Sequence, residues 1–249
     1  MKFFDKSDLA ALAANSKVGL ITLLVAFPPY AIVNHFFYDR PAVNLSLPID
    51  HWLAFDHRWI LVYAWVYVFL FLPVFIVKDT HSFRVVAKAF IIVNFTSVAI
   101  FILMPAKYAR PELTTQNEFL WWGTALNYFL DKPVNCFPSL HVGNAFMASM
   151  IAFHYRPRVG IIAWLLAALI SLSTLYMKQH FFVDIVMGFA VAFVVYRFYF
   201  RRRAFAPDSA PPLPEWMSAG VVLIYLGFIG SMYMVFKLGV QLPLDKIVR

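Results

Sequence analysis

The sequence has few charged residues, which soluble proteins place on their surfaces, and few cysteines, which form cross-links. Charged residues make up 14% of its 249 residues, whereas apolar residues make up 62%. A soluble domain is usually about 45–50% apolar, so the composition argues against an ordinary soluble fold. The single cysteine, Cys136, excludes an intrachain disulfide. We therefore predict an all-α fold, a polytopic membrane bundle of helices.

Two further kinds of pattern are missing. The chain has no internal repeat and no glycine-rich nucleotide loop. Its net charge of +8 would suggest nucleic acid as a partner of a soluble protein, but membrane orientation and anionic lipid headgroups account for it better here. We expect no nucleic-acid partner and no cofactor.

What the chain does have is seven apolar segments of about the length that crosses a bilayer. A six-helix core in residues 1–205 is expected to be followed by a Pro-rich linker, 206–215, and an extra C-terminal span and tail, 216–249. Pro28 and Pro29 should kink the first span or end it early. Trp121 and Trp122, in the long polar connection 106–137, are expected to be interface anchors. The predicted spans are 18–37, 59–77, 85–104, 138–155, 159–177, 181–198 and 216–239.

The first polar cluster opens the fourth predicted span with the sequence Cys-Phe-Pro-Ser-Leu-His. Pro138 suits the first turn of a helix and Ser139 suits its cap. Free N–H groups at such a helix start, together with the helix dipole, attract an anion such as phosphate. His141 lies within the first turn and could face the same anion.

The second cluster runs from Ser173 to Asp184. If the segment is one helix, Ser173 and His180 share a face, and His180 and Asp184 meet at i and i+4. If Lys178 and its neighbours instead form a turn, Ser173 belongs to the preceding helix and the His180–Asp184 pair can still form. In both cases the carboxylate would fix the tautomer of the imidazole and leave one nitrogen free as nucleophile or base.

A third group of charges precedes both clusters. Arg110 offers a planar fork for phosphate oxygens, and Lys107 offers a point charge. With a helix N-terminus and two histidines, these cations make a set suited to phosphoryl transfer. The set is not a cage of carboxylates or imidazoles, so we expect no metal.

The order Arg-Pro, Pro-Ser-x-His and Ser-x(6)-His-x(3)-Asp resembles the type 2 phosphatidic acid phosphatase superfamily. The family pattern has a lysine where this chain has Leu103, a glycine where it has Leu140 and an arginine where it has Thr174. The Pro-Ser-Leu-His form is similar to the inositol phosphorylceramide synthase-like branch, which moves phospho-headgroups between lipids. The resemblance covers about residues 110–184 and the order of the spans.

The resemblance implies a mechanism. His180 would attack phosphorus, Asp184 would orient it, and His141 would protonate the leaving group and then activate the acceptor. Phosphate would be bound by Arg110, Lys107, Ser139 and Lys178. The substrate would be a membrane lipid phosphate, and the acceptor either water, as in a phosphatase, or a lipid hydroxyl, as in a transferase.

Each of these residues also has a structural reading. Ser139 could act only as a helix cap, Arg110 only as a headgroup anchor, and His180 with Asp184 only as a structural pair. A proton relay or transporter is the rival function, since ionisable residues inside membranes often mark such pathways; a non-catalytic relative is another. The polar residues gather at one face and do not trace a path across the membrane, which favours the enzyme. The lipid, the acceptor and the oligomeric state stay open.

The orientation follows from the distribution of Lys and Arg. Of 21 such residues, twelve fall on the side that holds the N-terminus. Nine fall on the other side, and three of those are the site candidates Lys107, Arg110 and Lys178. The positive-inside rule then predicts a cytoplasmic N-terminus and an active site on the extracytoplasmic face.

Overall fold

The computed structural model describes residues 5–208, 211–244 and 247, and these residues form a bundle of helices without a β-strand. The all-α prediction is thus confirmed. Five helical stretches are long and apolar enough to cross a membrane. They contain α1 (Lys6–Phe36), α5 (Thr80–Leu103), α8 (Pro157–Tyr176), α9 (Phe182–Val195) with the π-helical turn η3 (Tyr196–Phe200), and α10 (Gly220–Lys237) preceded by η4 (Glu215–Ala219).

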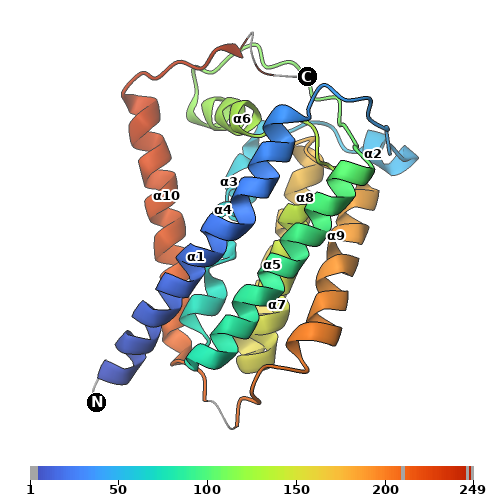
Figure 1. Ribbon diagram of the computed structural model, residues 1–249. Helices are drawn as coiled ribbons and strands as arrows, with labels where there is room; N and C mark the ends of the chain where they lie inside the picture. The colour runs from blue at the N-terminus through green and yellow to red at the C-terminus, as the bar shows by residue number, and fades with distance from the viewer. Residues whose placement is uncertain (1–4, 209–210, 245–246, 248–249) are drawn as a thin grey trace.

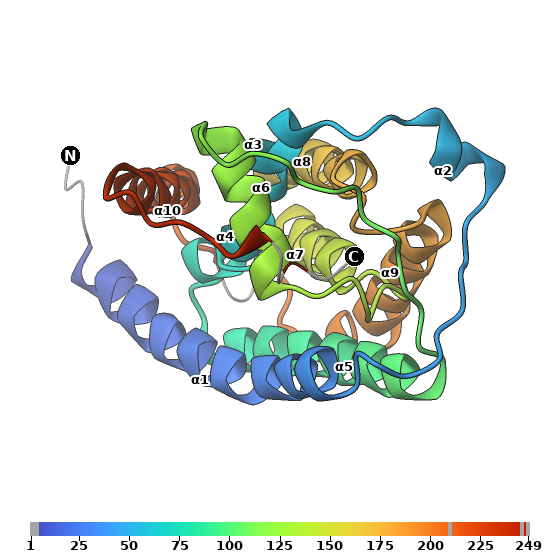
Figure 2. The ribbon, with the colours of Figure 1, turned by 90° about the horizontal axis from the view of Figure 1, so that it is seen from above.

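The helix α7 (Leu140–Tyr155) is shorter and lies in the middle of the bundle, between the α8–α9 pair and α5 (Figure 2). Most of its side chains are buried, and the hydroxyl of Ser149 donates to Ala163 O in α8 at 2.9 Å. Since neighbours surround it, α7 needs no lipid-facing side. Its N-terminus is therefore held rigidly within protein.

Gly188 explains how closely α9 approaches the start of α7. A Cβ atom at this position would lie 2.3 Å from Ser139 O, a distance that no real side chain occupies. The backbone N–H of Ser139 also donates to Asp184 O at 2.9 Å. The glycine thus permits close helix packing, and the contact joins the two polar clusters.

The second predicted span is not one helix. Residues 57–75 form four short pieces: η1 (His57–Trp59), α3 (Ile60–Tyr63), α4 (Val66–Phe69) and η2 (Leu72–Phe75). Pro73, which cannot donate a backbone hydrogen bond, lies in the last piece. Irregular backbone at membrane depth is tolerated where protein surrounds it or where it lines a cavity, and both conditions hold for this segment.

The first helix does not end at its prolines. Pro28 and Pro29 lie inside α1, which continues to Phe36, so the expected early end is wrong. Neighbouring groups hold the turns after the prolines: the Tyr30 hydroxyl and the Asn34 amide both donate to Asp131. Such contacts let membrane helices keep prolines that would break an isolated helix.

The connection 106–137 contains an unexpected helix, α6 (Phe119–Leu130). It lies across one end of the bundle, the end where the short α2 (Pro48–Trp52) also lies (Figure 1). Trp122 is fully buried and its indole N–H donates to Val240 O at 2.8 Å, while Trp121 stacks on His57. Trp122 is therefore a packing residue of the protein interior, which corrects its expected role as an interface anchor.

The outer helices carry apolar side chains on their surfaces. In α10, Leu223 is 70% exposed and Met234 is 62% exposed. Exposed apolar surface of this extent is stable only against lipid or another protein. Figure 1 shows α10 at the edge of the bundle, and it shows the start of α1 at the end opposite to α6.

Candidate active site

Two histidines from separate elements meet at the α6 end of the bundle. His141 lies in the first turn of α7, and His180 lies in the turn between α8 and α9. The Nδ1 atom of His141 is 3.0 Å from the Nε2 atom of His180. The Ser139 side chain caps α7 by accepting from the Val142 N–H at 3.3 Å. The predicted cap is confirmed, but Pro138 precedes the cap and is not in the first helical turn.

The surroundings of His180 decide which of its nitrogens carries hydrogen. Its Nδ1 atom is 2.9 Å from Cys136 O and 3.3 Å from Asp184 Oδ2. Since both partners are acceptors, Nδ1 is the donor, and Nε2 keeps its lone pair. The hydrogen in the His141–His180 contact then comes from His141. This geometry is that of an oriented nucleophile, His180, with a proton donor beside it.

The turn that carries His180 corrects the one-helix alternative for residues 173–184. The helix α8 ends at Tyr176 and α9 begins at Phe182. The hydroxyl of Ser173 donates to Ile170 O inside α8, away from His180. The carboxylate of Asp184 is fully buried at the start of α9, where it also accepts from the Phe181 N–H at 2.8 Å.

Arg110 is buried beside the histidines and held in place by protein acceptors. Its Nη1 atom donates to Asp131 O at 2.5 Å and its Nη2 atom donates to Gln179 Oε1. Its guanidinium lies over the ring of Tyr128, with the centroid 4.4 Å away. The Nε–H has no partner among the described residues, so one charged donor of a fixed group is left for a ligand.

Asn135 supplies a second unused donor, and sequence reasoning missed it. Its amide nitrogen is buried without a hydrogen-bond partner in the described part of the chain. The residue has φ of 63°, a conformation that asparagine adopts more readily than most residues. Asn135, Arg110, His141 and His180 all line one small cavity. Burying a donor without a hydrogen-bond partner costs free energy. An anion in this cavity would accept hydrogen bonds from both Arg110 Nε and the Asn135 amide.

A buried carboxylate, Asp131, lies at the rim of the same cavity and was also missed from the sequence. Its Oδ1 atom accepts hydrogen bonds from the Tyr30 hydroxyl at 2.5 Å and from the Asn34 amide at 3.1 Å. Burial raises the pKa of this carboxyl, and the nearby Arg110 opposes that rise. Nothing in the local sequence marks Asp131, because its partners lie about a hundred positions away in α1.

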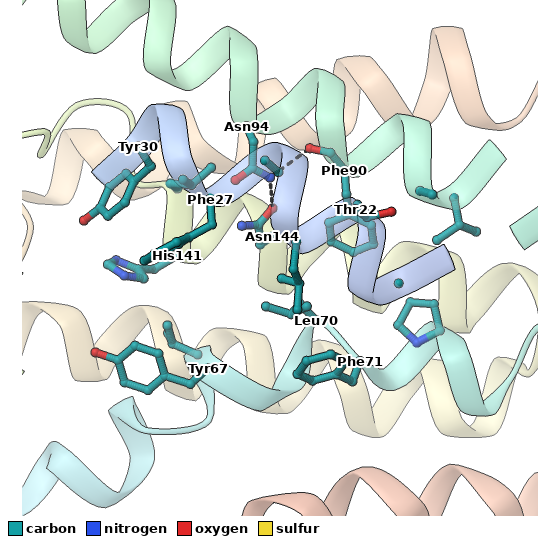
Figure 3. A pocket seen from close by; sticks show the side chains of 18 of the residues that line it. Thr22, Phe27, Tyr30, Tyr67, Leu70, Phe71, Phe90, Asn94, His141 and Asn144 are labelled. Carbon is teal, nitrogen blue, oxygen red and sulfur yellow. Dashed lines mark hydrogen bonds between the residues drawn. The ribbon is translucent and has the colours of Figure 1, made fainter. Parts of the chain in front are cut away.

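An apolar cavity with a volume of ≈ 420 Å³ leads to His141 from inside the bundle. One stripe of α1, one stripe of α5, the broken segment 66–74 and the start of α7 enclose it. Figure 3 shows His141, Tyr30 and Tyr67 at one end of this cavity and Phe71 and Thr22 farther along it. Its size and apolar lining are those of a ligand site.

Comparison with known families decides what this arrangement belongs to. The family model described as the PAP2 superfamily matches residues 24–198, more than half of the chain. This chain belongs to the PAP2 superfamily. The match begins inside α1 and ends inside η3, so it includes both histidines and leaves out α10.

One relative and the solved structures add little to the PAP2 assignment. The uncharacterized protein MJ0662 of Methanocaldococcus jannaschii is 34% identical over 77 residues, which are 29% of this chain and 31% of that protein. The alignment thus spans less than a third of the relative's length. No solved structure gives a significant match. Members of the PAP2 superfamily are in general phosphatases, and membership of this family supports an enzymatic role.

Two lysines that we had expected at the phosphate of this PAP2 site lie elsewhere. The ammonium of Lys178 donates to Asp50 O at 3.0 Å and to Leu53 O at 2.5 Å, and thereby holds the chain near α2 against the turn. The ammonium of Lys107 lies 5.5 Å from the centre of the Tyr38 ring. The structure does not bring either lysine to the cavity that Arg110 and Asn135 line.

Two of the three departures from the superfamily pattern have clear structural consequences. Leu103, at the pattern's lysine position, is 83% exposed at the end of α5 and points away from the protein. Thr174, at the pattern's arginine position, is fully buried and its hydroxyl donates to Ser171 O in its own helix. Its backbone carbonyl accepts from the N–H groups of Gln179 and His180. Thr174 thus shapes the turn that carries His180 without offering a charge.

Proposed function

We propose that this protein transfers a phosphoryl-containing group from a membrane lipid phosphate through a phosphohistidine at His180. The observation that carries the proposal is the His141–His180 contact of 3.0 Å, placed between a small cavity with unpaired N–H donors and a long apolar cavity. The phosphate would occupy the first cavity and a lipid chain the second. The fixed tautomer of His180 leaves Nε2 free to attack.

In the first chemical step the Nε2 lone pair of His180 forms a bond to phosphorus, and the bond from phosphorus to the leaving oxygen breaks. His141 gives a proton to that oxygen. Asp184 and Cys136 O hold the Nδ1–H of His180 and stabilise the positive charge that develops on the ring. A phosphorus atom between the two rings would take the place of the hydrogen bond that joins them.

The negative charge on the phosphate oxygens needs donors that are already in place. Arg110 Nε and Asn135 Nδ2 supply two of them. The N–H groups of Leu140 and His141 add to these, because the first turn of a helix lacks intrahelical acceptors. The Ser139 hydroxyl accepts from Val142 and keeps its own hydrogen for a phosphate oxygen.

In the second step His141 takes a proton from the acceptor, whose oxygen attacks phosphorus, and the phosphorus–nitrogen bond breaks. With water as acceptor the reaction is that of a phosphatase. With a lipid hydroxyl it is that of a headgroup transferase, as in the inositol phosphorylceramide synthase-like branch that the Pro-Ser-Leu-His sequence resembles. The phosphohistidine is unsubstituted when the donor is a lipid phosphate monoester, and it carries the headgroup on phosphorus when the donor is a phosphodiester lipid, as headgroup transfer requires.

The test uses purified protein in detergent with several lipid phosphates, each with and without an alcohol acceptor. Released phosphate indicates a phosphatase, and a phosphate ester of the added alcohol indicates a transferase. A radiolabelled intermediate should be acid-labile and alkali-stable, as a phosphoramidate is, and should be missing in His180→Asn. Label that persists in this variant, or no turnover of any lipid phosphate, would overturn the proposal.

A second variant separates the two histidines. In His141→Asn, the rate at which the phosphohistidine forms should fall far more with an alkyl lipid phosphate than with p-nitrophenyl phosphate, whose leaving group needs no proton. His180→Asn should lose both activities, because it removes the nucleophile. Equal losses in His141→Asn for both substrates would show that His141 does not protonate the leaving group.

A further inference from the structure

The apolar cavity contains two asparagines at a position that the proposed chemistry does not use. Asn144 follows His141 by three residues in α7, so the two side chains share a face about 4.5 Å apart along the helix axis. Asn94 faces it from α5 (Figure 3). Both residues line the cavity. Amides in otherwise apolar surroundings at membrane depth are costly and are often functional.

The hydrogen bonds of this pair leave specific groups unused. The Asn94 amide nitrogen donates to Phe90 O at 2.8 Å and to Asn144 Oδ1 at 3.1 Å, so both of its hydrogens are used. This fixes the orientation of both amides. The Asn144 nitrogen and Asn94 Oδ1 have no protein partner among the described residues. Figure 3 shows the Asn144 nitrogen on the side of its amide nearer Tyr30 and His141.

We propose that the Asn94–Asn144 amide pair is a binding site for an oxygen of the lipid backbone, a hydroxyl or a carbonyl a few bonds from the phosphorus. The inference rests on the proposed lipid phosphate substrate and narrows its class. The Asn144 nitrogen donates to that oxygen, and Asn94 Oδ1 accepts from it where it is a hydroxyl. Lipid phosphates with an oxygenated backbone are then preferred over simple alkyl or polyprenyl phosphates.

Position supports this assignment. With phosphate at the histidines, a lipid that continues along α7 reaches Asn144 within one helical turn. Glycerolipids and sphingoid lipids carry their first ester or hydroxyl oxygens at such a distance from phosphorus. The rival reading is that the pair only joins α5 to α7, as hydrogen bonds between membrane helices do. That reading gives no reason for the donor that is left open toward the cavity.

The experiment measures the Kd of three single-chain phosphonates of equal length, which bind without being turned over. One is an unsubstituted alkyl phosphonate, one carries a hydroxyl group near the phosphorus, and one carries an ester carbonyl there. Wild-type protein should bind an oxygenated probe about tenfold more tightly than the alkyl probe, the effect of one hydrogen bond. A preference for the hydroxyl probe alone indicates a sphingoid-like backbone, and a preference for both indicates a glycerolipid.

The variants separate recognition from structure. Asn144→Leu should bind all three probes with the affinity of the alkyl probe, whereas Asn94→Leu, which breaks the same interhelical bond but keeps the Asn144 donor, should retain much of the preference. Thr22→Val is the matched control: it lines the cavity, but its hydroxyl already donates to Val18 O, so the preference should not change. If Asn144→Leu does not fold, Asn144→Ala gives the same readout.

The outcomes also distinguish this inference from the proposed function. Equal Kd values for the three probes in wild-type protein, or a uniform loss for all probes in Asn144→Leu, would overturn the subsite. A clear preference without turnover of any lipid phosphate would keep the subsite and remove the catalytic proposal. Turnover of a lipid phosphate without a preference among the probes would keep the catalytic proposal and remove the subsite.

Discussion

At the scale of single residues, the site depends on which hydrogen-bonding groups are used and which are left open. His180 Nδ1 faces two acceptors, so Nε2 is free. Arg110 has used both terminal nitrogens, so Nε is free, and Asn135 has used no side-chain donor at all. These groups are buried around one cavity, where an unpaired donor costs about 1–3 kcal/mol. The unfilled donors therefore point to an anionic ligand.

Asn135 gives the first prediction. Asn135→Gly removes the amide but permits the positive φ, so the fold should persist while kcat/KM falls by about 100-fold, as on removal of one transition-state donor. Activity and melting temperature should be measured together. Asn117→Gly, an exposed position on the same side of the bundle, should leave both unchanged. An Asn135→Gly variant with normal kcat/KM would remove this residue from the phosphate site.

Asp131 gives a prediction about pH. Burial raises the pKa of its carboxyl, so the folded state binds the proton more tightly than the unfolded state does. The neutral acid therefore stabilises the fold below the ordinary carboxyl pKa, and that stabilisation is lost as pH rises through the raised value. Asp131→Asn, which can still accept from Tyr30, should melt at a higher temperature than wild type near pH 7.5. The difference should shrink toward pH 5; a difference that grows on acidification would contradict it.

At the scale of elements, the site is assembled by the ends of α7, α8 and α9. Ser139 N–H binds Asp184 O, and Thr174 O binds the N–H groups of the turn that carries His180. Gly188 allows α9 to approach the start of α7, the helix that carries His141, within backbone contact. The broken segment 57–75 has a different role, since its irregular turns enclose the apolar cavity.

Gly188→Ala tests the contact between α7 and α9. The added methyl would lie 2.3 Å from Ser139 O, and such overpacking typically costs about 1–3 kcal/mol. The melting temperature should drop by several degrees, and activity should fall with it because the His141–His180 distance changes. Gly227→Ala in α10 has nothing within 4 Å of the new methyl, so it should be neutral or slightly stabilising. Equal behaviour of the two variants would show that the close approach is not needed.

At the scale of the whole molecule, all site residues lie at one end of the bundle, and the start of α1 lies at the other (Figure 1). From the excess of Lys and Arg on the α1 side we predict, by the positive-inside rule, that this side is cytoplasmic. The candidate active site would then face away from the cytoplasm. The apolar cavity extends from it between helices that the membrane surrounds.

Thiol labelling tests this orientation. Thr114→Cys, exposed in the loop at the site end, should react with a membrane-impermeant reagent in intact cells, and Arg158→Cys, exposed at the opposite end, should react only after lysis. The native Cys136 should give no background, since it is buried and burial raises its thiol pKa. Labelling in the reverse order would place the site in the cytoplasm.

The sequence by itself determined the membrane-helical class, the approximate position of most spans, the cap at Ser139 and the pairing of His180 with Asp184. These features depend on local composition or on residues a few positions apart. The sequence did not reveal the broken second span, the helix α6, or the continuation of α1 through Pro28 and Pro29. In each of these segments contacts with distant residues outweighed the local preference.

Only the tertiary structure decided which polar residues share the cavity. It brought Asn135 and Arg110 to the histidines, tied Lys178 to carbonyls near α2, and placed Lys107 over an aromatic ring. The charge of a side chain is known from the sequence, but its partner depends on which distant segments of the chain pack beside it. The same holds for Asn94 and Asn144, fifty positions apart. Their pairing inside an apolar cavity exists only because α5 and α7 pack there.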